Sequence, residues 1–246
     1  MTALSHDPAR ARPTCQPVTS SESSGPAYRG QRFLDLTLAA LALPFVLPVI
    51  AVASLAVLLR DGRPVLYVSE RMRAPQGRFS CIKLRTMTRT DAGAASAVLG
   101  GDRQASVTSL GRLLRRSRID EFPQLWNVLK GEMGFVGPRP PLERYVRADG
   151  GTYTEVLKVR PGVTGLATII FHAYEERLLA KAKTAAETES AYVTRCIPRK
   201  ARLDLIYKRN ASAILDLYII YLTAARLLPL PGGRRVRRIR SRARAK

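Results

Sequence analysis

Residues 36–59 read LTLAALALPFVLPVIAVASLAVLL, an apolar stretch of 24 residues without a charged side chain. As an α-helix this stretch would be about 36 Å long, which exceeds the roughly 30 Å hydrocarbon core of a bilayer. It is longer than the apolar region of a secretory signal peptide, and the long segment before it is unlike a short basic leader. We therefore expect a membrane element that the protein retains.

Two prolines, Pro44 and Pro48, fall in the middle of this stretch. Each removes a backbone donor and clashes with the preceding turn, so we expect a sharp break there. Arginines flank both ends, with Arg32 before the stretch and Arg60 and Arg63 after it. Because positive charge marks cytoplasmic ends, the pattern favours a re-entrant helix–break–helix with both ends on the cytoplasmic side. A kinked helix that crosses the membrane is the alternative.

Composition divides the chain into four segments. Residues 1–28 are rich in Ser, Pro, Ala and Thr without periodicity, which is typical of a disordered leader. Residues 29–60 contain the membrane element, and residues 61–230 are expected to form one domain with interfacial helices on the cytoplasmic face. Residues 231–246 are a polybasic tail.

The net charge of +22 implies an anionic partner, which could be a phosphorylated substrate, an acidic membrane surface or nucleic acid. No aromatic residue interrupts the polybasic tail, so nucleic-acid bases would find no stacking platform there. The pattern therefore favours anionic membrane lipid over nucleic acid as the partner of the tail.

Cysteine and histidine offer little chemistry. Cys15, Cys81 and Cys196 are widely spaced, which argues against a disulfide framework or a zinc site. The histidines are His6 and His172, and we expect the latter to be a packing residue. A bound metal should therefore be a hard ion with oxygen ligands.

Several further elements can be predicted from local patterns. Pro64–Ser69 and Phe79–Arg85 indicate two strands of a β-hairpin, whose pairing would bring Lys83 and Arg85 toward the ligand side. Residues 90–106 are small and polar and predict a flexible loop, and residues 174–192 predict a polar helix. Ala213–Leu228 is apolar but contains Asp216 and Arg226, so we expect an amphipathic interfacial helix.

The segment Ser117–Gly131 reads SRIDEFPQLWNVLKG and contains two adjacent carboxylates, Asp120 and Glu121. Apolar residues recur at helical spacing after them, so the pattern predicts an amphipathic helix capped by Ser117 or Asp120. This apolar stripe consists of Phe122, Leu125, Trp126, Leu129 and Met133. One interpretation is that the two acids are ordinary residues at a helix N-terminus.

The arginines around the acid pair favour a different interpretation. A run of basic residues precedes the pair, and Arg139 follows it between Pro138 and Pro140, on a stiff backbone. The run consists of Arg112, Arg115, Arg116 and Arg118. Arginines hold phosphate oxygens, and a carboxylate can hold Mg²⁺ or attack phosphorus. The combination therefore suits a site that handles phosphate.

Several motifs of the chain resemble those of the bacterial sugar transferase family, the small polyprenyl-phosphate sugar-1-phosphate transferases that begin exopolysaccharide and O-antigen assembly. Separate motifs occur in the family's order. They are GRPV at 62–65, KLRTM at 83–87, LGRLLRR at 110–116, IDEFPQ at 119–124, NVLKGEM at 127–133, VGPRP at 136–140 and RPGVTG at 160–165.

The resemblance implies an α+β, mostly helical monotopic membrane protein with an N-terminal re-entrant helix–break–helix, a short β-hairpin and amphipathic interfacial helices. Residues 61–230 would then be the catalytic domain, on the cytoplasmic face of the bacterial inner membrane. The substrates would be a UDP-sugar and polyprenyl phosphate. Anionic membrane lipid would be a further partner, and nucleic acid would not. A homodimer is left open.

The resemblance also implies roles for individual residues. Asp120 would attack the β-phosphate, release UMP and carry a covalent phospho-sugar that polyprenyl phosphate then accepts, while Glu121 would hold Mg²⁺. The residues implied to bind substrate phosphates are Lys83, Arg85, Arg112, Arg115 and Arg139. The residues implied to support them are Gln124, Asn127 and Arg160.

One departure from the family pattern falls at residues 168–174. Where relatives commonly carry a polar loop with an arginine, this chain reads TIIFHAY, which puts sugar or nucleotide recognition there in doubt. Two other functions remain in view: a basic membrane-surface adaptor that needs neither Asp120 nor Glu121, and a membrane phosphatase with an aspartyl-phosphate.

Overall fold

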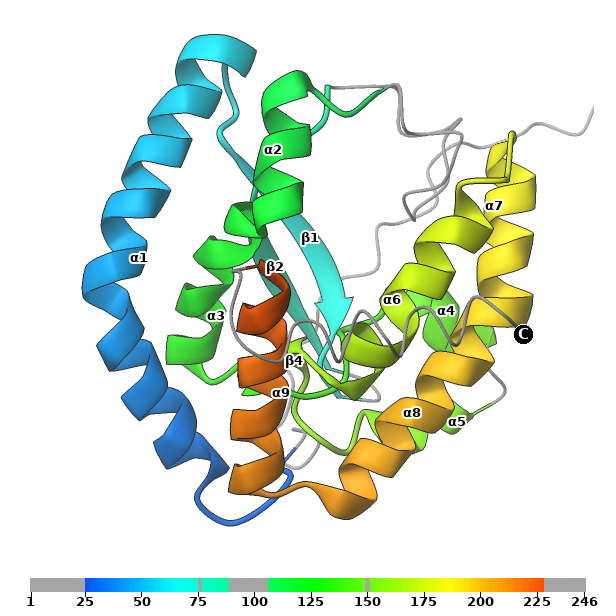
Figure 1. The fold of residues 1–246 in the computed structure, drawn as a ribbon. Helices are drawn as coiled ribbons and strands as arrows, with labels where there is room; N and C mark the ends of the chain where they lie inside the picture. The colour runs from blue at the N-terminus through cyan, green and yellow to red at the C-terminus, as the bar shows by residue number, and fades with distance from the viewer. Residues whose placement is uncertain (1–24, 75–76, 89–105, 149–150, 228–246) are drawn as a thin grey trace, which may run out of the picture.

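A computed structural model of the chain describes residues 25–74, 77–88, 106–148 and 151–227. These residues are mostly helical, with two small two-stranded sheets. Figure 1 shows α1 along one side of the molecule, with α2, α3 and α9 next to it and α4 to α8 on the other side. The expectations for residues 1–24 of the leader, for most of the 90–106 loop and for the polybasic tail lie outside the described residues. The end of the predicted leader is not disordered: Gly25 forms a parallel β-bridge with Val159, and Tyr28 donates a hydrogen bond to Asp216.

The helix α1, Gln31–Asp61, is continuous over 31 residues, with Pro44 and Pro48 inside it. The predicted break is therefore not present in this structure. The two prolines are four residues apart and exposed on the same face, so both lost hydrogen bonds fall on one side and the helix bows instead (Figure 1). By length and composition α1 could cross a membrane, and it exposes large apolar side chains such as Phe45 and Leu59.

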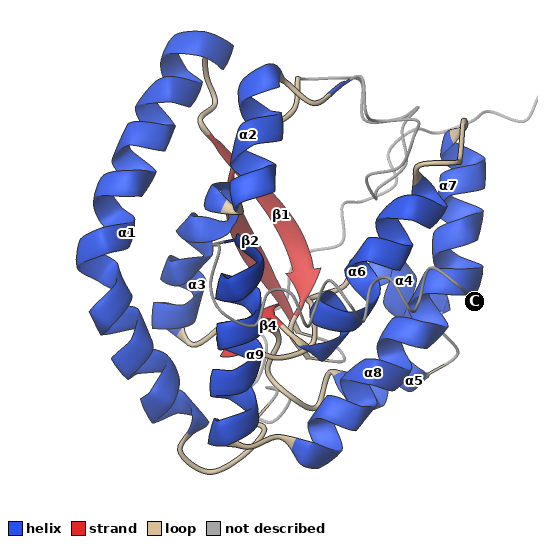
Figure 2. Cartoon of the chain, viewed as in Figure 1, coloured by secondary structure: helices blue, strands red, loops and turns tan. Residues whose placement is uncertain are grey.

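The strands β1, Leu66–Met72, and β2, Arg78–Leu84, form the predicted antiparallel hairpin, between α2 and the α6–α8 group (Figure 2). The expected strands overlap these bounds, although β1 begins later and extends further. Tyr67 pairs with Lys83, Ser69 with Cys81 and Arg71 with Phe79. Because cross-strand partners share a face, these residues lie on one side of the hairpin.

The strands β3, Gly134–Val136, and β4, Gly162–Thr164, pair in parallel and join two of the sequence motifs. A Cβ on Gly162 would lie 2.1 Å from the Gly137 nitrogen, and one on Gly165 would lie 2.1 Å from the Gly137 carbonyl oxygen. The glycines of the VGPRP and RPGVTG motifs therefore let two backbone segments touch, which places Arg139 next to this small sheet.

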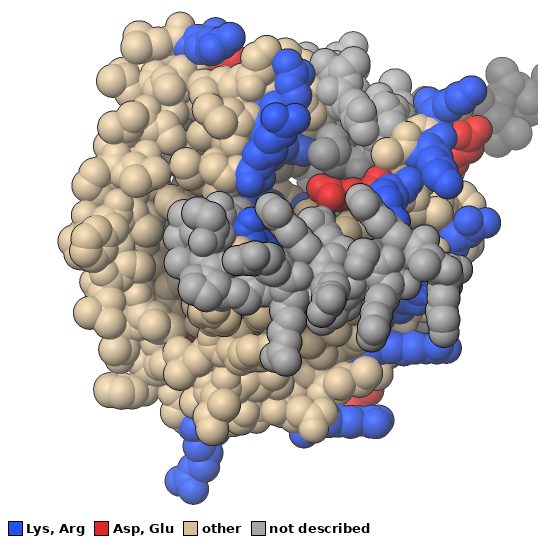
Figure 3. Space-filling model, viewed as in Figure 1, with Lys and Arg blue, Asp and Glu red and all other residues tan. Residues whose placement is uncertain are grey.

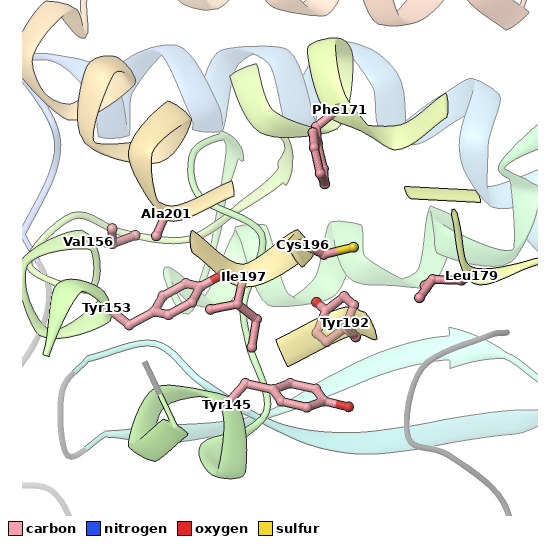
Figure 4. Close-up of a cluster of buried hydrophobic side chains, with 9 residues drawn as sticks. All are labelled: Tyr145, Tyr153, Val156, Phe171, Leu179, Tyr192, Cys196, Ile197 and Ala201. Atoms are coloured by element: carbon pink, nitrogen blue, oxygen red, sulfur yellow. The ribbon is translucent and has the colours of Figure 1, made fainter. Parts of the chain in front are cut away.

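The remaining helices complete the domain around several buried clusters. Figure 4 shows one cluster, in which Phe171 points toward Cys196, and the rings of Tyr145 and Tyr192 lie 4.8 Å apart between their centroids. The helices that contribute to it are α4 (Glu143–Ala148), α5 (Thr152–Val156), α6 (Leu166–Leu179) and α8 (Ile197–Asn210), with the π-helical turn Tyr192–Cys196.

The polar helix predicted over 174–192 is instead two helices, α6 and α7, Ala185–Ala191. Thr184 is the N-cap residue of α7, and its side chain accepts a hydrogen bond from the Glu187 backbone N–H. Glu187 in turn accepts one from the Lys183 backbone N–H, so the start of α7 is capped from both sides. The last described helix, α9, covers Ala213–Leu227 and agrees with the predicted one.

Candidate active site

The two acids lie in a short 3-10 helix, Ile119–Gln124, between α2, Ser109–Ser117, and α3, Leu125–Lys130. The prediction that Ser117 or Asp120 caps a longer helix is wrong. Ser117 donates back to the carbonyl oxygens of Leu113 and Leu114, and the 3-10 helix has no side-chain cap. Because a 3-10 turn has fewer residues than an α-turn, the face of the following helix is rotated, and Trp126 is 54% exposed rather than buried.

Arg118 joins α2 to the 3-10 helix with φ of 60°, and it is the one non-glycine residue with positive φ in the described part of the chain. This backbone conformation is costly for a residue with a side chain, and such strain often accumulates at functional sites. It turns the chain sharply between the arginine-bearing helix and the acid pair. The turn brings Arg118 back onto Glu121, three residues later.

Glu121 is enclosed by three basic side chains. Its Oε1 lies 2.7 Å from Arg139 Nη2 and 3.2 Å from Lys83 Nζ, and its Oε2 lies 3.3 Å from Arg118 Nη1. The Glu121 side chain is only 8% exposed. Burial alone would raise the pKa of Glu121, but Arg139, Lys83 and Arg118 outweigh that effect and hold the pKa well below its usual value.

Asp120 has a different environment although it is the next residue. It is buried, and its Oδ1 has no hydrogen-bond partner among the described residues. Burial, and then the charge of Glu121, raise its pKa, while Lys83, Arg115 and Arg118 act in the opposite direction. The pair therefore consists of one carboxylate that is saturated with cations and one with an oxygen still available.

The structure brings several of the predicted residues to this pair. Lys83 and Arg139 contact Glu121 directly, and Arg115 acts on Asp120 while its Nε donates to Thr86 Oγ1 at 2.7 Å. Gln124 is buried at the end of the same 3-10 helix.

Asn127 acts as a brace behind the site. Its Nδ2 donates to the Ser80 carbonyl oxygen at 2.8 Å and to Glu132 Oε2 at 2.6 Å, and its Oδ1 accepts from the Ile82 N–H. These bonds join α3 to β2, the strand that carries Lys83. The supporting role predicted for Asn127 therefore has a physical basis in the position of that strand.

Three of the predicted residues lie elsewhere. Arg85 donates to the carbonyl oxygens of Arg63, Gly62 and Asp61, at the C-terminal end of α1. Arg112 donates to the Val107 carbonyl oxygen and to Ser109 Oγ, at the start of α2. Arg160 lies near Asp35 of α1, with 3.9 Å between Nη1 and Oδ2. Their contacts in this structure are with the scaffold.

The prediction of His172 as a packing residue missed a polar neighbourhood. Its Nε2 lies 3.3 Å from Glu176 Oε1, and its side chain is 34% exposed. Burial and the charges of Arg118 and Arg139 lower its pKa to about 3. The TIIFHAY segment is helical and lies within α6, so it presents a neutral imidazole near the arginines.

The surface around the site is strongly basic on one side. In Figure 3, Lys and Arg side chains gather along α2 at one edge of a hollow, and acidic and basic side chains lie across from them over α6 and α7. A separate cavity of about 250 Å³ lies between the hairpin and α4 and is not lined by either acid of the pair. Within the described residues, no three His, Cys, Asp or Glu side chains gather as a metal site.

The family description "Bacterial sugar transferase" matches residues 27–229 of the chain. This chain belongs to the bacterial sugar transferase family. The resemblance drawn from the motifs is thereby confirmed, and the match extends through α9.

Named relatives of this sugar transferase have similar descriptions. A UDP-glucose:undecaprenyl-phosphate glucose-1-phosphate transferase of Caulobacter vibrioides is 40% identical over 144 residues, covering 56% of this chain and 53% of the relative. An undecaprenyl-phosphate glucose phosphotransferase of Komagataeibacter xylinus is 36% identical over 205 residues, covering 80% and 35%. The uncharacterized sugar transferase EpsL of Bacillus subtilis is 34% identical over 202 residues, covering 82% and 89%. The sugar transferase described here thus spans about half of the first of these relatives and about a third of the second.

Proposed function

We propose that this sugar transferase is a phosphoglycosyl transferase that moves a sugar 1-phosphate from a UDP-sugar to polyprenyl phosphate. The family membership supports this reaction class, and the names of relatives include undecaprenyl-phosphate phosphotransferases for glucose. The product, a polyprenyl-diphosphate-sugar, would begin the assembly of an exopolysaccharide or a related glycan.

The observation that carries this proposal is the contrast within the acid pair. Asp120 has a buried oxygen without a partner, whereas basic side chains saturate the oxygens of Glu121. A nucleophile needs a free oxygen, and phosphoryl transfer needs positive charge around the phosphate more than it needs an acid or a base. Asp120 and its basic neighbours offer that combination.

In the proposed first step, an Asp120 carboxylate oxygen attacks the β-phosphorus of the UDP-sugar. An O–P bond forms to Asp120 while the bond from that phosphorus to the bridging oxygen breaks, and UMP leaves with the bonding electrons. In the second step, a phosphate oxygen of polyprenyl phosphate attacks the same phosphorus. The bond to Asp120 then breaks and the free carboxylate returns.

This chemistry requires that Asp120 be ionised. Because burial and Glu121 raise its pKa, we expect activity to fall as the pH drops through a value above the usual range for an aspartate. Arg115 and Lys83 oppose that shift and would also neutralise the phosphates that approach. The acid limb of the pH–rate profile measures the balance between these effects.

The oxygen donors of the pair fit Mg²⁺, which in proteins is typically held by one or two carboxylates with substrate phosphates and water completing the shell. We propose that Glu121 would hold the ion, while the unpartnered Oδ1 of Asp120 stays available to attack phosphorus. Both Glu121 oxygens already face basic side chains, so some of these contacts would be exchanged for contacts to phosphate. When bound, Mg²⁺ would neutralise charge on the phosphates during transfer.

The lipid acceptor requires that the site lie near a membrane. The exposed apolar side chains of α1, together with Ile214, Leu217 and Tyr218 of α9, provide a surface that suits the bilayer and its interface. Although α1 is one continuous, bowed helix in this structure, we propose that in the bilayer it bends at Pro44 and Pro48 and is re-entrant, so that the domain lies on the cytoplasmic face of the bacterial inner membrane. The arginines at both ends of the apolar stretch support this placement.

The test is UMP release from a panel of UDP-sugars in membranes that carry the protein, with Mg²⁺ and polyprenyl phosphate added. The wild type is compared with Asp120→Asn, and wild-type protein incubated without acceptor is searched for a sugar-phosphate adduct on the peptide containing Asp120. Release that needs acceptor, metal and Asp120 supports the proposal and names the sugar.

Two outcomes would separate the alternatives. Phosphate release to water without acceptor would indicate a phosphatase. No release from any donor, with normal binding of Asp120→Asn to anionic vesicles, would indicate an adaptor.

A further inference from the structure

The hairpin carries a basic residue that neither the acid pair nor the sequence motifs account for. Arg71 lies on β1, on the same face as Tyr67 and Ser69 and their partners Lys83 and Cys81. Lys83 on this face contacts Glu121, so Arg71 lies on the side of the hairpin that faces the site.

The segment that carries Arg139 holds Arg71 in place. Arg71 Nη1 donates to the Pro140 carbonyl oxygen at 3.4 Å, and the Met72 backbone N–H donates to the Pro141 carbonyl oxygen at 3.0 Å. Arg71 Nε also donates to Ser69 Oγ at 3.0 Å. The two guanidinium groups of Arg71 and Arg139 are therefore positioned by one rigid, proline-containing stretch.

Arg71 differs from Arg139 in its charge partners. Arg139 is paired with Glu121, whereas no ion pair between described residues includes Arg71, and the two hydrogen-bond acceptors it uses are neutral. Burial and the charge of Arg139 both lower the pKa of Arg71. A largely buried guanidinium without a carboxylate is an unfavourable arrangement unless an anion binds to it.

The charge of the whole neighbourhood points the same way. Five basic side chains act on this region, against the two carboxylates of the acid pair. They are Arg71, Lys83, Arg115, Arg118 and Arg139. Glu175 also acts on Arg139, but it is itself paired with Lys200. The excess of positive charge matches a ligand with several negative charges, such as a diphosphate.

We propose that Arg71 is a further binding residue of the site and holds a substrate phosphate group beside Arg139. This inference rests on the proposed function, because both substrates of that reaction carry phosphate. The side chains of Arg71 and Arg139 both act on Lys83, which contacts Glu121, so a phosphate held beside Arg139 would lie within the field of Arg71. The guanidinium can bind phosphate with two parallel hydrogen bonds, which a lysine cannot do.

The experiment measures binding with the full chain, in an Asp120→Asn background so that no turnover occurs. Dissociation constants are determined for UDP, which represents the donor, and for a short-chain polyprenyl phosphate, which represents the acceptor. We expect Arg71→Gln to raise the dissociation constant of at least one ligand by about tenfold, and the affected ligand identifies the phosphate. Arg71→Lys should give an intermediate value.

Arg78→Gln is the matched control. Arg78 is on the same hairpin and, like Arg71, lines the cavity between the hairpin and α4, but it pairs with Glu143 at 2.6 Å and is not part of the cluster around the acid pair. We expect this variant to bind both ligands as the parent does. A loss of binding equal to that of Arg71→Gln would overturn the proposal, since it would show a general effect of hairpin charge.

Unchanged dissociation constants for both ligands in Arg71→Gln would also overturn it, while leaving the proposed transferase function intact. If that variant does not fold, as judged by thermal unfolding, Arg71→Lys decides: an unchanged dissociation constant overturns the proposal. Failure of the parent to bind either ligand, with no UMP release by the wild type, would instead overturn the proposed function and this inference with it.

Discussion

Two regions of the molecule bury carboxylates in different ways. In the candidate active site, Glu121 is enclosed by Arg139, Lys83 and Arg118. Where α9 meets the chain before α1, Asp216 accepts hydrogen bonds from the neutral hydroxyl groups of Tyr207, at 2.8 Å, and Tyr28, at 3.0 Å.

The first region has the features of a ligand site. The second region, formed by Tyr28, Gln31, Tyr207 and Asp216, is a structural contact between elements, called here the structural joint. In the first region basic side chains outnumber the acids, which leaves positive charge for an anion, and Asp120 keeps an oxygen without a partner. In the second region the donors and acceptors satisfy one another: Gln31, for example, donates to the Val136 carbonyl oxygen and accepts from the Ala27 N–H. Burial of polar groups therefore marks function only where partners are missing or charges are unbalanced.

The largest expected effect is that of Asp120→Asn. It should reduce UMP release by more than about a thousandfold, because it removes the proposed nucleophile. It should not lower the melting temperature, since the raised pKa of Asp120 shows that ionisation is unfavourable in the folded protein. Parallel assays of activity and thermal unfolding test both parts. If Asp120→Asn loses activity because it is unfolded, as shown by a lowered melting temperature, the proposed contrast between Asp120 and Glu121 is contradicted.

Glu121→Gln should instead destabilise the fold, by about 3 kcal/mol, because it leaves three basic side chains without their buried partner. Denaturant unfolding measures this change. Glu155→Gln is the control: Glu155 also contacts two lysines, Lys158 and Lys208, but at an exposed position, so little change is expected. Equal effects of the two substitutions would show that the Glu121 cluster is no more than a surface ion-pair network.

Much of the site could be predicted from the sequence because adjacent acids among arginines are a local pattern. Which of the basic residues contact the acid pair could not be predicted in the same way. Arg112 and Arg115 belong to one run, yet only Arg115 acts on Asp120, because α2 turns Arg112 toward its own N-terminal end. Arg71 was missed because no motif drew attention to it, and its role depends on the hairpin register and on contacts to the Pro140–Pro141 backbone.

The fold shows the same division. The hairpin and the helix α9 could be predicted from local periodicity, and both are present. The break in α1 was predicted from Pro44 and Pro48, but the effect of two prolines on one exposed face is to bow the helix, which composition alone does not reveal. Trp126 is exposed although it belongs to the predicted apolar stripe, and the 3-10 turn before α3, which follows the positive φ of Arg118, is a backbone feature that apolar spacing does not reveal.

The structural joint should make stability depend on pH. Burial raises the pKa of Asp216 to about 6, above its value in an unfolded chain. The folded state therefore binds the proton of the Asp216 carboxyl group more tightly than the unfolded chain does. The stability gained from this proton is complete below the unfolded pKa and is lost as the pH rises through about 6. Relative to Asp216→Asn, the wild type should lose on the order of 2 kcal/mol of unfolding free energy across that window. A constant difference between the two proteins would contradict this assignment.

The smallest expected effect is that of Tyr207→Phe, which removes one hydroxyl group from the same joint. Tyr207 is fully buried, and its hydroxyl donates to Asp216 Oδ1, so the loss should cost about 1 kcal/mol of unfolding free energy. Because that hydrogen bond favours ionised Asp216, the pH window should also move upward in the variant. The kcat should stay unchanged, since among the described residues the hydroxyl of Tyr207 forms hydrogen bonds with Val136, Gln31 and Asp216 and not with the acid pair. A large drop in kcat at full folding would mean that the joint and the active site are coupled, and the two regions could no longer be treated as independent.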